Sequence, residues 1–347
     1  MVRQIKRQAV YFTDIGQVTV RKESTPMPGP TQVLVQTRYS AISPGTEMLL
    51  YRGQFPPELS LDANIPDLSG GFKYPLKYGY AAVGKVIQIG SKVDPIWTDR
   101  EVFAFHPHES HFITSVQELH PLPAALSIED ALFLPNMETA VNFLLDSRPI
   151  LGERVVVLGQ GIVGLLTTAL LAWYPLSKLI TLDRYPLRRQ ASLTLGAHES
   201  LDTDSPETAQ NLERIFPAGA DLVFELSGNP EVLNQAIQLT GHSGRVIVGS
   251  WYGTKLAELK LGGRFHRERI NLISSQVSSL TPELSGRWDK ARRLQVAWEA
   301  LAALRPSRLI TQRIPLEEAP LAYQLIDREP ENAIQVVLDY NKTTTIN

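Results

Sequence analysis

Short apolar and β-branched runs, broken by glycine and proline, dominate the first third of the chain. Examples are residues 32–39 (QVLVQTRY), 82–89 (AVGKVIQI) and 101–105 (EVFAF). Runs of this length, bounded by turn residues, are typical of β-strands. The pattern predicts a twisted, largely antiparallel β-domain in the N-terminal part of the chain.

The hydrophobic pattern changes near residue 127. Residues 127–147 have helical spacing, with Ser127 as the N-cap and Asp130 three residues later. Strand and helix patterns then alternate, which predicts an α/β fold with a parallel sheet and helices on both of its faces. The segments are, in order, 154–158, 162–173, 179–182, 187–195, 221–225, 230–239 and 245–248.

The last part of the chain returns to mixed signals. Residues 288–304 and 319–327 have the pattern of amphipathic helices, residues 333–338 that of a strand, and residues 341–347 form a polar tail. We expect this stretch to fold back onto the N-terminal β-domain.

Composition and charge exclude several function classes. The chain has 347 residues, enough for two domains, and a net charge of −2, which gives no electrostatic reason to expect nucleic acid or membrane as a partner. The absence of cysteine excludes disulfides, cysteine-ligated zinc and a cysteine nucleophile. The longest apolar stretch, residues 162–173, is too short for a membrane span. These features favour a cytoplasmic protein.

The sharpest local motif is Gly159-Gln160-Gly161-Ile162-Val163-Gly164, which follows a predicted strand directly and opens a predicted helix. In a dinucleotide fingerprint the first glycine allows the tight turn, the second lets the backbone approach a pyrophosphate, and the third permits close packing of helix on strand. The helix N-terminus supplies N–H groups for the phosphates. The alternative interpretation is a glycine-rich turn that binds no dinucleotide.

An acidic residue ends the next predicted strand. Asp183 comes nineteen residues after Gly164, where a carboxylate accepts hydrogen bonds from the ribose hydroxyls of NAD. Arg184 and Arg188 follow and could hold a 2′-phosphate. The acid favours NAD(H) as the cofactor, and the arginines keep NADP(H) possible.

Small residues end two later strands, at Ser227-Gly228 and Gly249-Ser250. Ligands of open α/β sheets bind outside the carboxyl ends of the strands. We therefore expect these residues to border the nicotinamide, with ordinary turn chemistry as the alternative.

Six segments in a fixed order resemble the medium-chain dehydrogenase/reductase superfamily, and the resemblance covers nearly the whole chain. They are GTEMLLYRG, YPLKYGYAAVGKVIQIG, EVFAFHPHESHFI, METAVNFL, GERVVVLGQGIVGLL and DLVFELSGNPEVLNQAIQLTGHSGRVIVGSWYG. The resemblance implies a GroES-like β-domain (1–137), a Rossmann domain (138–278) and a return to the first domain (279–347). Within the superfamily, ISPGTEMLLYRG and GYAAVG are similar to the bacteriochlorophyllide 3-hydroxyethyl dehydrogenase branch and to bacterial dehydrogenases of unassigned substrate.

The positions that match the zinc ligands of this superfamily hold other residues. Pro44 stands at the first cysteine position, Gly79-Tyr80-Ala81 replaces the Gly-His-Glu step, and Pro135 stands at the later cysteine position. Because proline and alanine cannot ligate zinc, we expect no catalytic metal. A weaker metal or substrate-contact hypothesis is left open for His106, His108 and His111.

Without zinc, another group must handle the charge and proton at the substrate oxygen. In the resemblance, Tyr80 occupies the position of the zinc-ligand histidine, and Thr46 occupies that of the residue whose hydroxyl touches the substrate oxygen. Glu47 occupies the position of an acid that often contacts the active-site residues without touching the substrate. Ser43 is a weaker candidate, and Thr139 matches a residue near the nicotinamide.

The segment between residues 52 and 78 is long and contains aromatic residues. Long loops are often lids or binding loops. The aromatic side chains are equally consistent with a bulky substrate and with internal packing.

Together these features predict a zinc-independent NAD(P)-dependent oxidoreductase that acts on an alcohol or carbonyl of a fairly bulky small molecule. Two alternatives remain: an NADPH-dependent quinone or enoyl reductase, and a non-catalytic nucleotide-binding protein. The resemblance also implies a homodimer.

Overall fold

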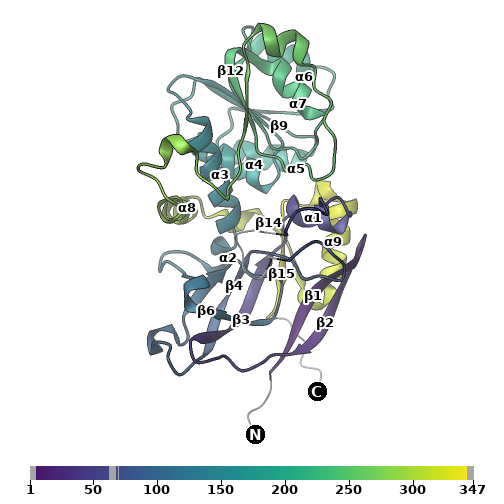
Figure 1. The fold of residues 1–347 in the computed structure, drawn as a ribbon. Coiled ribbons are helices and arrows are strands. Elements are labelled where there is room, and N and C mark those ends of the chain that lie inside the picture. The colour runs from purple at the N-terminus through teal and green to yellow at the C-terminus, as the bar shows by residue number, and fades with distance from the viewer. Residues whose placement is uncertain (1–4, 62–67, 69, 342–347) are drawn as a thin grey trace. The chain divides into compact units, whose positions relative to one another are not determined.

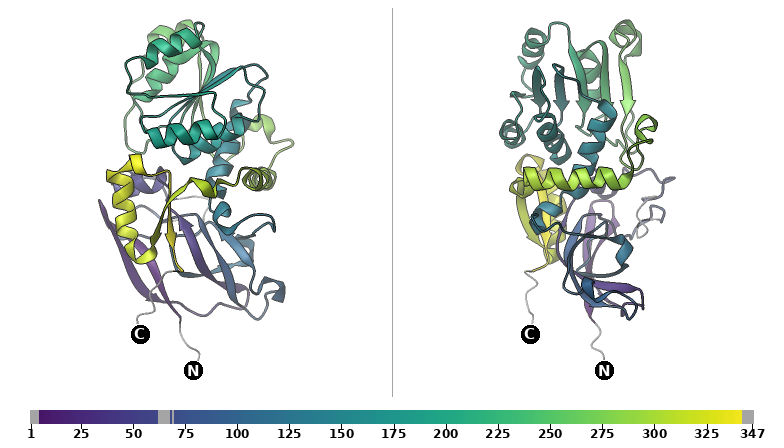
Figure 2. Two further views of the ribbon diagram at one scale, coloured as in Figure 1. Left: turned by 180° about the vertical axis from the view of Figure 1, so that it is seen from behind. Right: turned by 90° about the vertical axis from the view of Figure 1, so that its left-hand side faces the viewer.

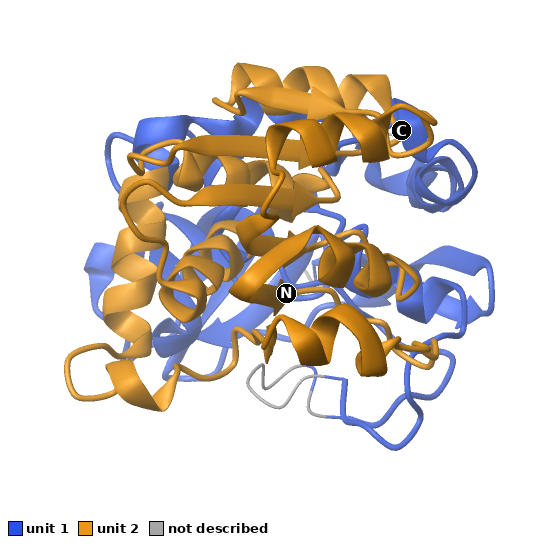
Figure 3. Ribbon diagram, turned by 90° about the horizontal axis from the view of Figure 1, so that it is seen from above, with its two compact units in different colours: residues 1–135, 301–347 blue, residues 136–300 orange. Residues whose placement is uncertain are grey.

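The computed structural model describes residues 5–61, 68 and 70–341 (Figure 1). The chain divides into two compact units, unit 1 (Met1–Pro135 with Leu301–Asn347) and unit 2 (Asn136–Ala300), coloured separately in Figure 3. The chain passes from one unit to the other inside helices α3 (Leu134–Ser147) and α8 (Lys290–Leu304). The domain boundaries at 137/138 and 278/279 stay predictions, and residues 279–300 group with unit 2.

Unit 1 is built on a seven-stranded, mostly antiparallel sheet, as the N-terminal pattern predicts (Figure 2). The strand order is β14-β15-β3-β4-β5-β7, and β6 pairs with β3. A separate antiparallel pair is formed by β1 (Lys6–Asp14) and β2 (Gln17–Ser24). The bounds of the sheet strands are β3 (Gln32–Ala41), β4 (Ala82–Ile89), β5 (Glu101–Ala104), β6 (His111–Ser115), β7 (Leu119–Pro121), β14 (Ile310–Pro315) and β15 (Gln335–Asp339).

The C-terminal stretch returns to unit 1, as predicted. Strand β15 pairs antiparallel with β3, with Val337 opposite Ala41. Helix α9 (Ala319–Arg328) adds its apolar face to the core of this unit, where the rings of Phe12 and Tyr323 meet edge to face at 5.1 Å. Burial of these apolar side chains stabilises an arrangement of segments that are far apart in the sequence.

Unit 2 has a six-stranded parallel sheet in the order β10-β9-β8-β11-β12-β13, which confirms the predicted α/β fold with a Rossmann-like parallel sheet. After β8 the chain adds β9 and β10 on one side of the sheet, and it then returns to place β11, β12 and β13 on the other side. Strands β8 and β11 are therefore the neighbours that form the topological switch point. The strands are β8 (Arg154–Leu158), β9 (Lys178–Leu182), β10 (Glu199–Leu201), β11 (Ala220–Glu225), β12 (Thr240–Val248) and β13 (Asn271–Ser274). The helices between them are α4 (Ile162–Leu171), α5 (Pro186–Thr194), α6 (Thr208–Ile215) and α7 (Val232–Leu239).

One predicted helical segment is two helices. Residues 127–147 form α2 (Ile128–Ala131) and α3, and the Ser127 hydroxyl caps α2 by accepting the Asp130 N–H at 3.0 Å. Pro135 explains the break, because proline is tolerated in the first turn of a helix but not in its interior. Strands β10 and β13 and helix α6 were not among the predicted segments, since the two strands are short and lack a buried apolar run.

Across the described part of the chain, no helix combines the length and the apolar character that crossing a membrane requires.

Candidate active site

The turn after β8 has the geometry that the glycine motif predicts. Gly159 has φ of +90°, and a β-carbon there would lie 2.7 Å from the Leu226 backbone. A β-carbon on Gly164 would lie 2.0 Å from the carbonyl oxygen of Gly159, whereas one on Gly161 would meet nothing within 4 Å. The first and third glycines are therefore required by the fold, while the second leaves open space at the start of α4, where a pyrophosphate could approach.

Polar contacts brace this turn. The Gln160 side chain is fully buried, donates to the Gly159 carbonyl oxygen at 3.1 Å and accepts the Thr168 hydroxyl at 3.0 Å. The backbone N–H of Gln160 donates to Oδ2 of Asp183 at 2.7 Å. Of the two other predicted binding residues in the turn, Ile162 is buried and Val163 is half-buried at the start of α4.

Asp183 lies immediately after β9, in the position predicted for a ribose acceptor. It is 6% exposed, and its second oxygen, Oδ1, accepts the Tyr185 N–H at 2.9 Å. Arg184 is exposed and pairs with Asp204 at 3.7 Å, while the Arg188 guanidinium stacks over the Tyr185 ring at 4.8 Å. The acid thus tethers the turn before α4 to the end of β9, and the two arginines lie beside it in sequence.

The predicted residues at the ends of β11 and β12 contact one another. The Ser250 hydroxyl accepts the Gly228 N–H at 2.9 Å and lies 3.4 Å from the carbonyl oxygen of Glu225. Gly249 is packed closely, because a β-carbon there would lie 2.3 Å from the Phe143 ring. Thr139 is half-buried in α3.

Glu225 is a residue of this region that the sequence reasoning missed. It ends β11 and is fully buried, and its Oε1 accepts the Ser227 N–H at 2.8 Å and also the Ser227 hydroxyl. Its Oε2 accepts the Tyr252 phenol, and burial together with the Glu225 charge raises the pKa of Tyr252. The available signal was an acid directly after the apolar run of a central strand.

In unit 1, Tyr80 is surrounded by hydroxyl groups. Its phenol donates to the Ser43 hydroxyl at 2.5 Å and lies 3.3 Å from that of Thr46. Gly79 before it has φ of +121°, and a β-carbon there would lie 2.7 Å from the His108 ring. The structure brings the Tyr80 phenol beside the Thr46 hydroxyl, and Ser43, the weaker candidate of the sequence analysis, is the direct partner of the phenol.

Glu47 faces the interior of unit 1, away from solvent. It is fully buried, and it accepts the Ser43 N–H at 2.8 Å, His108 Nε2 at 3.0 Å and the Tyr323 phenol. Burial and the Glu47 charge hold the pKa of Tyr323 well above its ordinary value. The Glu47 carboxylate therefore holds the Ser43 backbone N–H and joins Ser43, His108 and Tyr323 in one buried network.

The three histidines of the HPHESH segment have separate partners. His108 is fully buried and its Nδ1 contacts the Ser40 hydroxyl at 2.7 Å. His106 stacks on Phe112, and His111 contacts the Ser110 hydroxyl through Nδ1 at 3.1 Å. Among the residues that the structure describes, no group of three or more His, Cys, Asp or Glu side chains is placed to hold a metal ion.

The long segment between residues 52 and 78 is described only in part, since residues 62–67 and 69 lie outside the described residues. In the described part, Phe55 is 1% exposed and its ring lies 5.3 Å from that of Phe72, which in turn contacts Tyr74 at 5.0 Å. These aromatic side chains pack into or against the core of unit 1.

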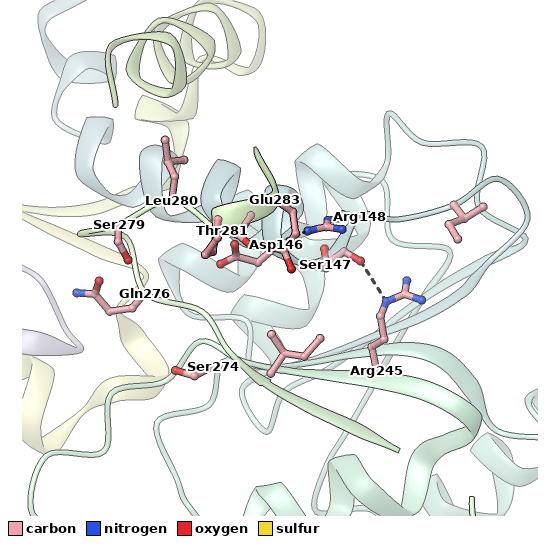
Figure 4. A pocket seen from close by; sticks show the side chains of 13 residues that line it. Asp146, Ser147, Arg148, Arg245, Ser274, Gln276, Ser279, Leu280, Thr281 and Glu283 are labelled. Atoms are coloured by element: carbon pink, nitrogen blue, oxygen red, sulfur yellow. Dashed lines mark hydrogen bonds and ion pairs between the residues drawn. The ribbon is translucent and has the colours of Figure 1, made fainter. Parts of the chain in front are cut away.

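Unit 2 also contains a pocket of about 750 Å³ (Figure 4). It is lined by residues from the end of α3 and by the segment after β13, and the Arg245 side chain in its wall donates to the Ser147 carbonyl oxygen at 3.1 Å. Its lining includes none of the residues that the sequence predicts for cofactor or catalysis.

Comparison with known proteins places these features in a family context. Residues 163–294 match the family model described as "Zinc-binding dehydrogenase". The D-guloside 3-dehydrogenase of Escherichia coli K12 is 23% identical over 321 residues, covering 88% of this chain and 92% of that protein. The 2-desacetyl-2-hydroxyethyl bacteriochlorophyllide A dehydrogenase of Cereibacter sphaeroides is 24% identical over 351 residues, with 95% and 96% coverage.

Solved structures share the fold across the whole chain. A putative zinc-binding dehydrogenase from Sinorhizobium meliloti, bound to NADP, superposes with a TM-score of 0.75 at 20% identity, covering 97% of this chain and 100% of that one. An Escherichia coli protein described as a short chain alcohol dehydrogenase, complexed with NADH, superposes with a TM-score of 0.78 at 16% identity, covering 96% and 99%.

Proposed function

We propose that this chain, a medium-chain NAD(P)-dependent dehydrogenase of the zinc-type alcohol dehydrogenase superfamily, oxidises an alcohol or reduces a carbonyl without zinc and uses NAD(H) as its preferred cofactor. The observation that carries the proposal is the hydroxyl cluster formed by Tyr80, Ser43 and Thr46, in which the sequence resemblance assigns Tyr80 to the position of a zinc-ligand histidine. A homodimer and a cytoplasmic location stay predictions.

The donor groups around Tyr80 do not suit zinc. Structural and catalytic zinc ions bind three or four nitrogen, sulfur or carboxylate oxygen ligands. Two such groups in unit 1, the Glu47 carboxylate and the His108 imidazole, are fully buried and contact each other at 3.0 Å. A metal bound there would have to displace this buried contact, in which Glu47 also accepts the Ser43 N–H and the Tyr323 phenol.

The hydroxyl cluster can handle the substrate oxygen instead. When bound, the nicotinamide accepts or donates the hydride, which leaves the protein to manage the proton and the charge on oxygen. The Tyr80 phenol can donate a hydrogen bond to a carbonyl oxygen, and the Ser43 hydroxyl, which contacts the phenol, can then donate a hydrogen bond to the phenol oxygen. Glu47 holds the Ser43 backbone through the N–H at 2.8 Å, so the hydroxyl stays aimed at the phenol.

The preference for NAD(H) rests on Asp183. Its carboxylate stands at the end of β9 with both oxygens on backbone N–H groups, and it carries a negative charge where NADP would bring a 2′-phosphate. Arg184 is already paired with Asp204, so its charge is partly neutralised. Like charges repel, and we therefore expect NADH to bind more tightly than NADPH.

A titration with NADH and NADPH, followed by quenching of tryptophan fluorescence, tests the cofactor preference. Metal analysis of the same preparation tests zinc independence. Tighter binding of NADH with no stoichiometric zinc is expected. One zinc per chain would contradict the metal-free mechanism, and a preference for NADPH together with turnover of enones or quinones would establish the reductase alternative.

The role of Tyr80 is tested with Tyr80→Phe on the best substrate from a panel of alcohols, carbonyls, enones and quinones. Loss of a positioned proton donor lowers kcat by about 10²–10⁴-fold, while KM and the melting temperature stay near the wild-type values. Tyr11→Phe is the matched control, because the Tyr11 phenol donates to Glu23. Equal kcat values for Tyr80→Phe and Tyr11→Phe would remove Tyr80 from the mechanism.

A further inference from the structure

Glu225 is a buried carboxylate that, among the residues the structure describes, accepts hydrogen bonds from three uncharged donors. They are the Ser227 N–H, the Ser227 hydroxyl and the Tyr252 phenol. In these three bonds both carboxylate oxygens act as acceptors, Oε1 twice and Oε2 once. The fully buried side chain therefore places a negative charge that solvent screens weakly.

The position of Glu225 in the sheet relates this charge to the nucleotide site. In the register between β8 and β11, Glu225 lies opposite Leu158, the residue that precedes Gly159. Strands β8 and β11 are the neighbours at which the strand order reverses. Dinucleotides bind across the carboxyl ends of the strands at such a point. Asp183 lies on the β9 side of it, and Glu225 lies on the β11 side together with Ser250.

The sequence predicts that the nicotinamide lies beside Ser227-Gly228 and Gly249-Ser250, at the ends of β11 and β12, and the inference rests on that prediction and on the proposed function. The oxidised nicotinamide ring carries a positive charge, and addition of a hydride, which brings two electrons and a proton, neutralises it. A fixed negative charge near the ring stabilises the oxidised form more than the reduced form. We propose that Glu225 acts as an electrostatic positioning residue that favours binding of the oxidised cofactor over the reduced one.

This charge biases the bound cofactor toward the form that accepts hydride. The site then favours oxidation of an alcohol over reduction of a carbonyl, relative to a site without the charge. Coulomb's law sets the scale of such a bias: for any two unit charges about 10 Å apart at an effective dielectric constant of about 20, a binding ratio changes by about tenfold.

The experiment measures the dissociation constants of NAD⁺, NADH, NADP⁺ and NADPH by calorimetry for the wild type and for Glu225→Gln. Glutamine keeps the shape and an acceptor oxygen but removes the charge. We expect the preference for the oxidised over the reduced cofactor to fall by about tenfold in the variant. An equal change in both affinities would overturn the proposal, since it would show a purely structural role. Failure of the wild type to bind any of the four nucleotides would instead refute the proposed function.

A second variant keeps the inference testable if Glu225→Gln does not fold. Tyr252→Phe removes one neutral donor and leaves the carboxylate charged and less shielded, so the preference for the oxidised form is expected to rise. A ratio that stays constant or falls would overturn the proposal. Asp221→Asn is the matched control, because Asp221 lies near the other end of β11 and pairs with Arg154 at 2.9 Å. A tenfold change of the ratio in this control would also overturn it.

Discussion

Substitutions of Gly164 and Gly161 in the turn after β8 should affect different properties, the first the stability of the fold and the second the binding of the cofactor. Gly164→Ala places a β-carbon 2.0 Å from the carbonyl oxygen of Gly159, where an ordinary carbon–oxygen contact needs more than 3 Å. Helix α4 or the turn must therefore move by about 1 Å, a displacement that costs about 1–3 kcal/mol in a well-packed interior.

Gly161→Ala should behave in the opposite way. Gly161 has φ of −64° and ψ of −179°, a conformation that alanine adopts without strain, and its β-carbon would meet nothing within 4 Å. Folding stability should stay the same or rise slightly, because alanine has fewer unfolded conformations than glycine. The added methyl group would, however, occupy the space through which a pyrophosphate approaches the N-terminus of α4.

Two measurements on each variant distinguish these effects. For a unit of this size, 1 kcal/mol corresponds to about 2–4 °C, so Gly164→Ala should melt roughly 4–8 °C below the wild type at a cost of about 2 kcal/mol. Gly161→Ala should melt within about 1 °C of the wild type and yet bind NADH at least about tenfold more weakly, which is 1.4 kcal/mol. Wild-type affinity in Gly161→Ala would refute the assignment of this turn to the pyrophosphate.

Three further predictions follow from other buried groups. Arg293→Met should lower the free energy of unfolding, measured by urea titration, by about 3–5 kcal/mol. Arg293 is 1% exposed, and its removal leaves Glu138 without the guanidinium that it contacts at 2.8 Å. A decrease in the free energy of unfolding of less than about 1 kcal/mol would contradict this prediction. Gly79→Ala should lower the melting temperature of unit 1, because the added β-carbon would lie 2.7 Å from the His108 ring and the backbone of residue 79 has φ of +121°. An unchanged melting curve would contradict this and show that the His108 ring moves aside at no cost. Burial raises the pKa of the Asp146 carboxyl above its ordinary value of ~3.9. The folded state therefore keeps the carboxyl proton to higher pH than the unfolded state does, and the free energy of unfolding of the wild type falls as pH rises between the two pKa values. Asp146→Asn should be the more stable protein at pH 8 and lose its advantage at low pH, and parallel curves of stability against pH for the two proteins would refute this.

The elements that depend on local sequence were predicted well. The spacing of apolar residues identified strands such as β8 and helices such as α4, because side-chain periodicity is a property of each segment by itself. Ser127 was recognised as an N-cap for the same reason, since a cap bonds to an N–H only three residues away. The roles of Gly159 and Gly164 also followed from the motif, and the close contacts at both positions agree with it.

The groupings of residues far apart in the chain could not be predicted in this way. Tyr323 donates to Glu47 across 276 positions of sequence, and the bond exists only because α9 returns to the core of unit 1. The pairing of His108 with Glu47 is likewise a product of burial, because neither residue carries a local pattern that specifies the other. The resemblance to a family supplied the position of Tyr80, while Ser43 as its direct partner became visible only in the folded chain.

The sequence by itself determined the α/β class, the glycine turn and the candidate position Asp183, since these depend on short-range periodicity, backbone freedom and motif spacing, while the candidate Tyr80 came from the family resemblance. Tertiary structure decided which of the candidate side chains are buried and which partners they contact. It turned Glu47 inward, it joined His108 to Glu47 and Ser40, and it placed the Glu225 carboxylate at the strand-order reversal. The physical reason is that the burial of a side chain and the partners of its hydrogen bonds depend on the whole packed chain. Segments that are far apart in the sequence supply these contacts as readily as adjacent residues do.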